Sequence, residues 1–340
     1  MPIIFNLSSE KGKIIQGVYN FHSHPNGLFE QIPVAIMEGM EDGPTISISA
    51  NIHGDEYTGT LAIHELLRNQ ELLEGLKGRI IFLSSLNPVG ATQGKRNYSF
   101  SDIDPNRSFP DEKSIQSEPQ NLVEENMREI FQELRKHSKF HMDLHCSKII
   151  SNPFCYLRQC YSENEIDQMV YKTSKLAANS FGVPIVFNGS GEFDNTKNTF
   201  IGAMVFLAKI PGFTVELGSK NVVAVEHIRT GINGIKNVLV YLGLLDERFW
   251  SDFSLPEHLQ AGNSQISLHP KMPLSGIIRF LVKPGDEIKE KQPIALLRDI
   301  HGRDIGDGFV YSDFAGHVLC QIEGAFFQKG STLLKIAKKK

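Results

Sequence analysis

The segment Asn51-Ile52-His53-Gly54-Asp55-Glu56 combines a turn residue with side chains that can bind a metal. The alternating apolar run at residues 44–50 precedes it and a helical pattern at residues 56–67 follows it, which predicts a strand, a tight turn at Gly54 and a helix start. His53 and Glu56 are three positions apart, so both side chains can converge on one point across this turn. An imidazole nitrogen and a carboxylate oxygen that converge beside a helix N-terminus form half of a zinc site.

A zinc site with an open position needs a third ligand, and His145 is the candidate. It belongs to the alternating segment 140–146, which predicts a strand that ends at the ligand. Cys146 is an alternative as an extra ligand or a nucleophile, although alternation along a strand points it away from the face of His145. His22 and His24 also look like a metal pair, but they lie in a turn-rich segment that favours an exposed loop.

Four further segments follow the first stretch in order. They are Gly94-Lys95-Arg96, Asp104-Pro105-Asn106-Arg107, Asp143-Leu144-His145 and Val215-Glu216-Leu217-Gly218. Together with residues 51–56 they resemble the succinylglutamate desuccinylase/aspartoacylase family, relatives of zinc carboxypeptidases, over most of residues 30–250. The resemblance implies one zinc per chain, held by His53, Glu56 and His145.

The same resemblance implies roles for four more residues. Glu216 matches the general base that takes the proton of the attacking water and passes it to the leaving nitrogen. Arg96 matches the arginine that polarises the carbonyl, while Asn106 and Arg107 match the pair that grips a substrate carboxylate. Asp143 is either an acceptor that orients His53 or His145, or a hydrogen-bonded aspartate of the core.

The rest of residues 1–250 alternates between strand and helix patterns. We expect strands at residues 13–21, 31–37, 45–52, 79–83, 140–146, 183–187 and 212–217, and helices at 56–67, 163–181, 199–208 and 225–244. This order predicts an α/β fold of the zinc carboxypeptidase type, with a mixed, mostly parallel sheet flanked by helices. His53, His145 and Glu216 fall at or just past strand ends, where open α/β sheets place their sites.

Two features of the expected helices are more specific. The helix at 56–67 should bury Leu61, Leu66 and Leu67. Ser117 and Gln120 are spaced as a capping box that begins another helix, with Pro119 in its first turn. The apolar stripe of this second helix has helical spacing and is assigned to the core; it consists of Val123, Met127, Ile130, Phe131 and Leu134. Residues 89–112 lack periodicity and are expected to form a long functional loop.

The C-terminal part contains an internal repeat of short strands. Segments 275–297 and 315–336 are similar, with an offset of 40 between Gly276 and Gly316 and of 39 between Gly285 and Gly324. The repeat resembles the two halves of a biotinyl/lipoyl-type barrel-sandwich module. The connection at residues 298–313 contains no lysine, which argues against a swinging-arm carrier and favours a lid or oligomerisation role. We therefore predict a zinc-hydrolase domain at residues 1–258 and a β barrel-sandwich domain at residues 262–340.

Composition limits the range of partners. The chain has 340 residues, 41% hydrophobic and 22% charged, and a net charge of −4, which gives no basic field for nucleic acid. Lys338 to Lys340 are expected to form a solvated tail. The start of the chain lacks a signal-peptide pattern and no apolar run is of membrane-spanning length, so a cytoplasmic protein without a membrane partner is expected. A homo-oligomer stays possible, and the four cysteines are expected to be reduced.

These observations lead to one main functional hypothesis and two alternatives. The main one is a zinc-dependent hydrolase that cleaves the acyl amide of a small N-acyl amino acid, as expected from the resemblance. Family members of this length with a C-terminal module include deacylases of acetylated diamino acids. The alternatives are a metallocarboxypeptidase acting on short peptides, which shares the ligand and base arrangement, and a metal-binding sensor without turnover.

Overall fold

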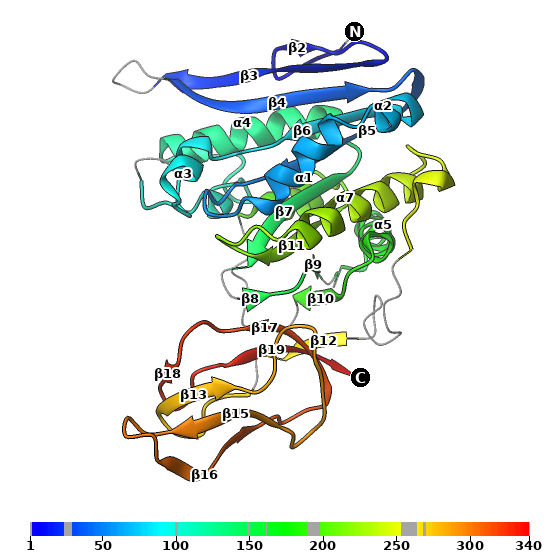
Figure 1. Cartoon of the computed structure of the whole chain (residues 1–340). Helices are drawn as coiled ribbons and strands as arrows, with labels where there is room; N and C mark the ends of the chain where they lie inside the picture. The colour runs from blue at the N-terminus through cyan, green and yellow to red at the C-terminus, as the bar shows by residue number, and fades with distance from the viewer. Residues whose placement is uncertain are drawn as a thin grey trace.

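The computed structural model describes residues 2–23, 29–98, 101–147, 150–158, 160, 162–188, 198–252, 264–267 and 270–339. Its larger part is an eight-stranded sheet between two layers of helices, and a smaller β module follows at the C-terminal end (Figure 1). The strands of the large sheet, in spatial order, are β10 (Ile185–Asn188), β9 (Phe154–Arg158), β11 (Gly212–Ser219), β7 (His141–Ser147), β5 (Glu41–Ala50), β6 (Lys77–Leu83), β4 (Phe29–Glu38) and β3 (Lys13–Ser23).

The large sheet is mixed and mostly parallel, which confirms the predicted fold class. The pairs β10–β9, β11–β7, β7–β5 and β5–β6 are parallel, whereas β9–β11, β6–β4 and β4–β3 are antiparallel. β7 and β11 lie side by side, and Glu216 is the register partner of His145. The fold therefore brings two predicted site residues together near the carboxyl ends of adjacent strands.

Helices cover both faces of this sheet. The helices are α1 (Thr58–Leu67), α2 (Gln70–Gly75), α3 (Pro88–Gln93), α4 (Leu122–His137), α5 (Glu165–Phe181), α6 (Phe200–Gly202) with a π-helical continuation (Ala203–Leu207), and α7 (Val225–Tyr241). In β6, Ile80 and Phe82 pack in one core with α1, α5 and α7, while Ile81 and Leu83 pack in the other with α4. Apolar side chains on both faces explain the continuous apolar run of this strand.

The start of α4 differs from the sequence prediction. The helix begins at Leu122, and its N-cap is Asn121, whose side chain accepts a hydrogen bond from the Glu124 amide. Glu124 accepts in return from the amide of Gln120. The predicted capping box of Ser117 and Gln120 is thus wrong by four residues: Asn121 caps the helix, and Glu124 reaches back to the amide one residue before the cap. The predicted apolar stripe of this helix is buried throughout, as expected.

Other differences are local. α1 begins at Thr58 and buries Ala62, Ile63 and Leu66, whereas Leu61 and Leu67 are only half-buried. α2, α3 and β9 have no counterpart in the prediction, and α3 occupies the start of the long loop expected at residues 89–112. β7 and β11 continue two and three residues past His145 and Glu216, so these residues lie inside the strands.

The C-terminal module is built from two antiparallel sheets. One consists of β12 (Ser264–Ser267), β19 (Leu334–Lys339), β17 (Gly316–Gln321) and β14 (Glu287–Ile288); the other consists of β16 (Asp304–Tyr311), β15 (Pro293–Arg298), β13 (Gly276–Phe280) and β18 (Phe326–Phe327). β14 of the first repeat pairs with β17 of the second, and β18 of the second pairs with β13 of the first. This reciprocal exchange confirms the internal repeat, because each half completes the sheet of the other.

The end of the chain and the domain boundary were both predicted from the sequence. Lys338 and Lys339 belong to β19, so the expected solvated tail is a strand as far as residue 339. The predicted boundary between residues 258 and 262 lies outside the described residues, and the division into residues 1–258 and 262–340 stays a proposal.

A short hairpin, β1 (Ile3–Ile4) with β2 (Leu7–Ser8), opens the chain. In the described part of the chain, no helix combines the length and apolar character needed to cross a membrane.

The position of the α4 cap gives a direct test. We expect Asn121→Ala to lower the free energy of unfolding by about 1 kcal/mol, because the Glu124 amide loses its acceptor at the helix start. Ser117→Ala, at an exposed position outside the helix, should leave stability unchanged. Urea titrations of the two variants would decide, and a larger loss for Ser117→Ala would contradict the observed cap.

Candidate active site

The turn after β5 is shaped by the side chain of Asn51. This residue has a φ of +54°, a left-handed conformation that asparagine adopts more readily than most residues. Its Nδ2 donates to the carbonyl oxygens of His53, Gly54 and Glu56 at 3.1, 3.2 and 3.0 Å, and its Oδ1 accepts from Ser85 at 2.6 Å. One buried amide therefore fixes the backbone that carries His53 and Glu56.

Gly54 allows this turn to pack closely against α3. A Cβ atom at this position would lie 2.2 Å from the carbonyl carbon of Gly90, which no side chain could tolerate. The Gly54 amide also donates to the carbonyl of Arg96 at 3.4 Å. Glu56 comes before the first residue of α1, so the pair of His53 and Glu56 is set by the turn and not by the helix.

His53, Glu56 and His145 converge as the sequence predicts. Glu56 Oε1 is 2.8 Å from His53 Nδ1, and Glu56 Oε2 is 2.9 Å from His145 Nδ1. All three residues are buried, and their ligand-capable atoms lie within 4.8 Å of one another. Among the described residues this is the one such cluster of histidine, cysteine and acidic side chains, so the structure assembles a candidate metal site from two segments, with Glu56 and His145 89 positions apart.

The outer nitrogens of both imidazoles face carboxylates. His53 Nε2 is 3.1 Å from Asp104 Oδ1, and His145 Nε2 is 2.8 Å from Asp143 Oδ2. Hydrogen bonds at Nε2 favour the tautomer whose Nδ1 is free to bind a metal, which is the arrangement that metal-binding histidines usually have. Of the two readings of Asp143, the structure shows the acceptor that orients His145, and Ser49 in turn holds Asp143 at 2.7 Å.

Asp104 is a site residue to which sequence reasoning gave no role. Its Oδ1 accepts from the amide of Asn106 at 2.9 Å, and its Oδ2 accepts from Arg96 Nη2 at 3.0 Å. Asp104 caps the short 3-10 helix Pro105–Arg107, and no local pattern in the sequence indicates its contact with His53. Asp104 thus links the long loop to the first histidine.

The charges in the cluster support one another. Burial would raise the pKa of Glu56, but His53 and His145 lower it on balance. Burial would likewise lower the pKa of His145, but Asp143 and Glu56 raise it well above the ordinary value. In the metal-free chain the carboxylates are therefore ionised and His145 carries a proton, which a divalent cation would displace on binding.

Glu216 stands apart from this network. Its Oε2 atom is buried and, among the described residues, has no hydrogen-bond partner. Burial, and next the charge of Glu56, raise its pKa to about 7, against the lowering effect of His145 and Lys335. A carboxyl group with a pKa near neutrality can both accept and release a proton at physiological pH.

The two arginines of the long loop lie in different environments. Arg96 donates to Glu56 Oε1 at 3.2 Å and is mostly buried beside the cluster. Arg107 is exposed, and its Nη1 donates to the carbonyl of Asn106 at 2.6 Å. The Asn106 side chain is buried, accepts from the Phe200 amide at 2.8 Å and lies 3.3 Å from His145 Nε2. Arg96 and Asn106 therefore border the cluster directly, while Arg107 lies at its outer side.

The other residues considered as metal ligands are Cys146 and the pair His22 and His24. The Cys146 amide donates to Glu56 Oε2 at 3.0 Å, while its thiol faces the carbonyl of Leu217 and burial raises its pKa to about 12. The backbone of Cys146 supports the cluster and its sulfur points elsewhere, as strand alternation predicts. The side chains of His22 and His24 lie outside the described residues.

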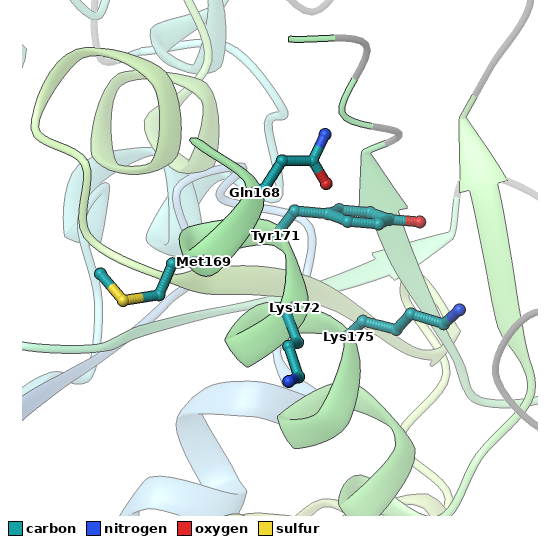
Figure 2. Close-up of a pocket in the computed structure, with 5 residues that line it drawn as sticks. All are labelled: Gln168, Met169, Tyr171, Lys172 and Lys175. Carbon is teal, nitrogen blue, oxygen red and sulfur yellow. The ribbon is translucent and has the colours of Figure 1, made fainter. Parts of the chain in front are cut away.

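A surface hollow on α5 is separate from this site. Figure 2 shows its lining residues, Gln168, Met169, Tyr171, Lys172 and Lys175, all from one helix. None of them belongs to the cluster or to the residues that contact it. The hollow therefore adds nothing to the candidate site.

Comparison with known proteins agrees with the fold. The model of the succinylglutamate desuccinylase/aspartoacylase catalytic domain family matches residues 42–242 of the 340-residue chain. This range contains every residue of the cluster as well as Glu216, Arg96 and Arg107. The chain belongs to this family.

Three individual proteins illustrate this similarity in sequence and structure. The N-alpha-acetyl-L-2,4-diaminobutyric acid deacetylase of Halomonas elongata is 26% identical over 280 residues, which cover 79% of this chain and 74% of that protein. The product-bound Ectoine utilization protein EutE (DoeB) of Ruegeria pomeroyi superposes with a TM-score of 0.73 at 20% identity, over 95% of this chain and 94% of that one. An aspartoacylase family protein of Mesorhizobium loti gives a TM-score of 0.74 at 17% identity, over 96% and 95%.

The strand that carries His145 also carries a buried histidine whose protonation should limit acid stability. His141 Nδ1 lies 2.8 Å from Ser47 Oγ, and burial lowers its pKa to about 4. The unfolded chain, with an ordinary pKa, binds this proton first, so stability should fall as the pH drops from about 6.5 towards 4. At about pH 5 the expected loss from this residue is about 2 kcal/mol.

Urea titrations at neutral pH and at about pH 5 test this expectation. His141→Gln should lose less stability between the two pH values than the wild-type chain does, because the glutamine does not titrate. An equal acid loss in both proteins would show that His141 does not control it.

Proposed function

We propose that this protein is a zinc-dependent hydrolase that cleaves the amide bond of a small N-acyl amino acid. The observation that supports it most is the buried cluster of His53, Glu56 and His145, together with Glu216 on the neighbouring strand, whose buried Oε2 atom has no hydrogen-bond partner in the described part of the chain. Membership of the desuccinylase/aspartoacylase family and the deacetylase name of the relative from Halomonas elongata support the same reaction class.

The donor set fits one zinc ion per chain. Two imidazole nitrogens and one carboxylate form a set that is found at catalytic zinc sites with an open position. His53 and His145 would bind through Nδ1, because their Nε2 atoms face Asp104 and Asp143. When bound, the ion would supply a water of lowered pKa and an electrophile for the amide carbonyl.

The remaining chemistry belongs to the side chains. Glu216 would take a proton from the attacking water and give it to the amide nitrogen as the carbon–nitrogen bond breaks, so that a carboxylate and an amine leave. Its pKa of about 7 suits both transfers. Arg96, held by Glu56 and Asp104, would donate to the carbonyl oxygen as negative charge develops on it.

Substrate recognition is assigned to the outer edge of the long loop. The Arg107 guanidinium is exposed there, and a planar fork of this kind can bind a carboxylate through two parallel hydrogen bonds. The Asn106 Nδ2 contact with His145 uses at most one of its two hydrogens, so the second N–H would donate to the same carboxylate beside Arg107. Asn106 and Arg107 together form the proposed clamp on the substrate carboxylate.

Zinc content tests the ligand assignment. The purified chain should hold about one zinc, and His145→Ala should lose it, because two remaining ligands cannot close a site against water. His64→Ala, on the exposed face of α1, is the matched control and should keep the metal. Metal analysis after dialysis gives the readout, and full zinc occupancy in His145→Ala would refute the assignment.

The role of Arg107 distinguishes two classes of enzyme: an N-acyl amino acid hydrolase needs a group that binds the substrate carboxylate, whereas a general amidase does not. Arg107→Ala and replacement of the substrate carboxylate by a neutral amide should each cost about 2 to 5 kcal/mol in kcat/KM, because each leaves one charge poorly paired. The combination should be little worse than either change alone, as expected for a shared interaction. Arg107→Lys should rescue poorly, since an ammonium lacks the two-pronged geometry.

Steady-state kinetics on N-acetyl amino acids and their amides supply these values. Short peptides with a free carboxylate belong in the same assay, because preference for them would favour a metallocarboxypeptidase. If the two losses simply add, or if the wild-type enzyme hydrolyses the neutral amide equally well, Arg107 is a structural residue of the loop.

A further inference from the structure

One lysine of the C-terminal module reaches the large sheet. Lys335 lies in β19, and its Nζ donates to the hydroxyl of Tyr156 in β9 at 3.1 Å. The same ammonium lies 5.8 Å from the centroid of the Tyr156 ring. Both contacts join a strand of the module to a strand of the sheet that carries the candidate site (Figure 1).

Tyr156 projects from the face of the sheet that carries Glu216. β9 and β11 are antiparallel, with Tyr156 opposite Thr214 and Phe154 opposite Glu216. Directly opposed residues point to the same face, and so do alternate residues of one strand. Glu216 is in turn the register partner of His145. The Lys335 ammonium therefore arrives on the side of the sheet that holds the cluster.

The junction fixes the backbone on both sides of this contact. Leu319, Cys320 and Ala337 of the module pack with Phe154 and Val186 of the sheet in one buried cluster. The short strand β8 (Ile150–Ser151), which belongs to the larger part, pairs with β17 and extends the sheet of the module. Lys335 is thus held in place by its neighbours and is not a mobile surface lysine.

The charges on the two sides are complementary. Glu216 has a buried Oε2 atom without a hydrogen-bond partner among the described residues. The Lys335 ammonium has three donors, and the described hydrogen bond to Tyr156 uses one of them. Burial would lower the pKa of Lys335, but Tyr156, Cys320 and Glu216 raise it on balance, so the group is a cation.

We propose that Lys335 is a positioning residue for Glu216: its ammonium, anchored on the Tyr156 hydroxyl, attracts the Glu216 carboxylate as a charge pair at longer range than a hydrogen bond and favours its orientation towards the cluster of His53, Glu56 and His145. The inference rests on the proposed function, in which Glu216 is the general base. The C-terminal module would then contribute to catalysis, because it carries Lys335, which orients the general base Glu216.

The first test needs neither activity nor metal. Unfolding constants of the metal-free full-length chain are measured for Glu216→Gln, Lys335→Met and the double variant. If the two groups pair, the effects of the single changes are not additive, and the cycle should show a coupling of about fivefold or more in the unfolding constant. Additive effects at Lys335 would overturn the proposal.

Lys338→Met is the matched control for this cycle. Lys338 lies on the same strand but is exposed, and its ammonium lies over the ring of Phe314, 4.3 Å from the centroid. Its combination with Glu216→Gln should be additive. A coupling as large as that of Lys335 would show a general charge effect and would also overturn the proposal.

The second test is kinetic and uses the zinc-loaded chain. Lys335→Met should lower kcat about 10- to 100-fold with KM nearly unchanged, and Lys335→Arg should recover part of the loss. An increase in KM at constant kcat would make Lys335 a substrate-binding residue and contradict the positioning role. Wild-type chain that hydrolyses no N-acyl amino acid would refute the proposed function, while the unfolding cycle would still decide the pairing.

Discussion

The buried carboxylate of Glu56 is the interaction on which the candidate site depends. A carboxylate removed from water needs partners for both oxygens, since an unpaired buried charge is very costly. Oε1 is met by His53 and Arg96, and Oε2 by His145 and the amide of Cys146. These partners come from the turn after β5, the long loop and β7, so one charge ties three distant segments together.

The same requirement extends outward from the cluster. Both imidazoles face Glu56 through Nδ1, so their Nε2 atoms need other partners. Asp104 is the partner of His53 Nε2, and Asp143 is the partner of His145 Nε2. Asp104 brings the long loop over the site, and Ser49 fixes Asp143 within the sheet. The side chains of the cluster are therefore held by a second layer of hydrogen bonds. A metal bound at Nδ1 of His53 and His145 would find these ligands already oriented.

The C-terminal module depends on a different principle. Its two repeats exchange short strands, so neither half can complete a sheet alone. The module then docks on the large sheet through a small apolar cluster and the added strand β8. Such an arrangement places Lys335 next to Tyr156, on the sheet that carries Glu216, 119 positions earlier in the chain.

The class of fold, the apolar stripe of α4 and the internal repeat were predictable from the sequence, because alternation, helical spacing and self-similarity are local patterns. The three clustered residues were predictable as candidates from a histidine three positions before a glutamate, a strand that ends near His145 and the ordered segments that resemble the family. The sequence did not reveal the cap at Asn121, the contact of Asp104 with His53, or Lys335 beside Tyr156. These depend on which of several similar local signals the packed chain uses, and on strands that meet only after folding. Propensity and spacing act over a few residues, whereas the burial of a charge selects its partners from the whole chain, and only the tertiary structure decides which residues those are.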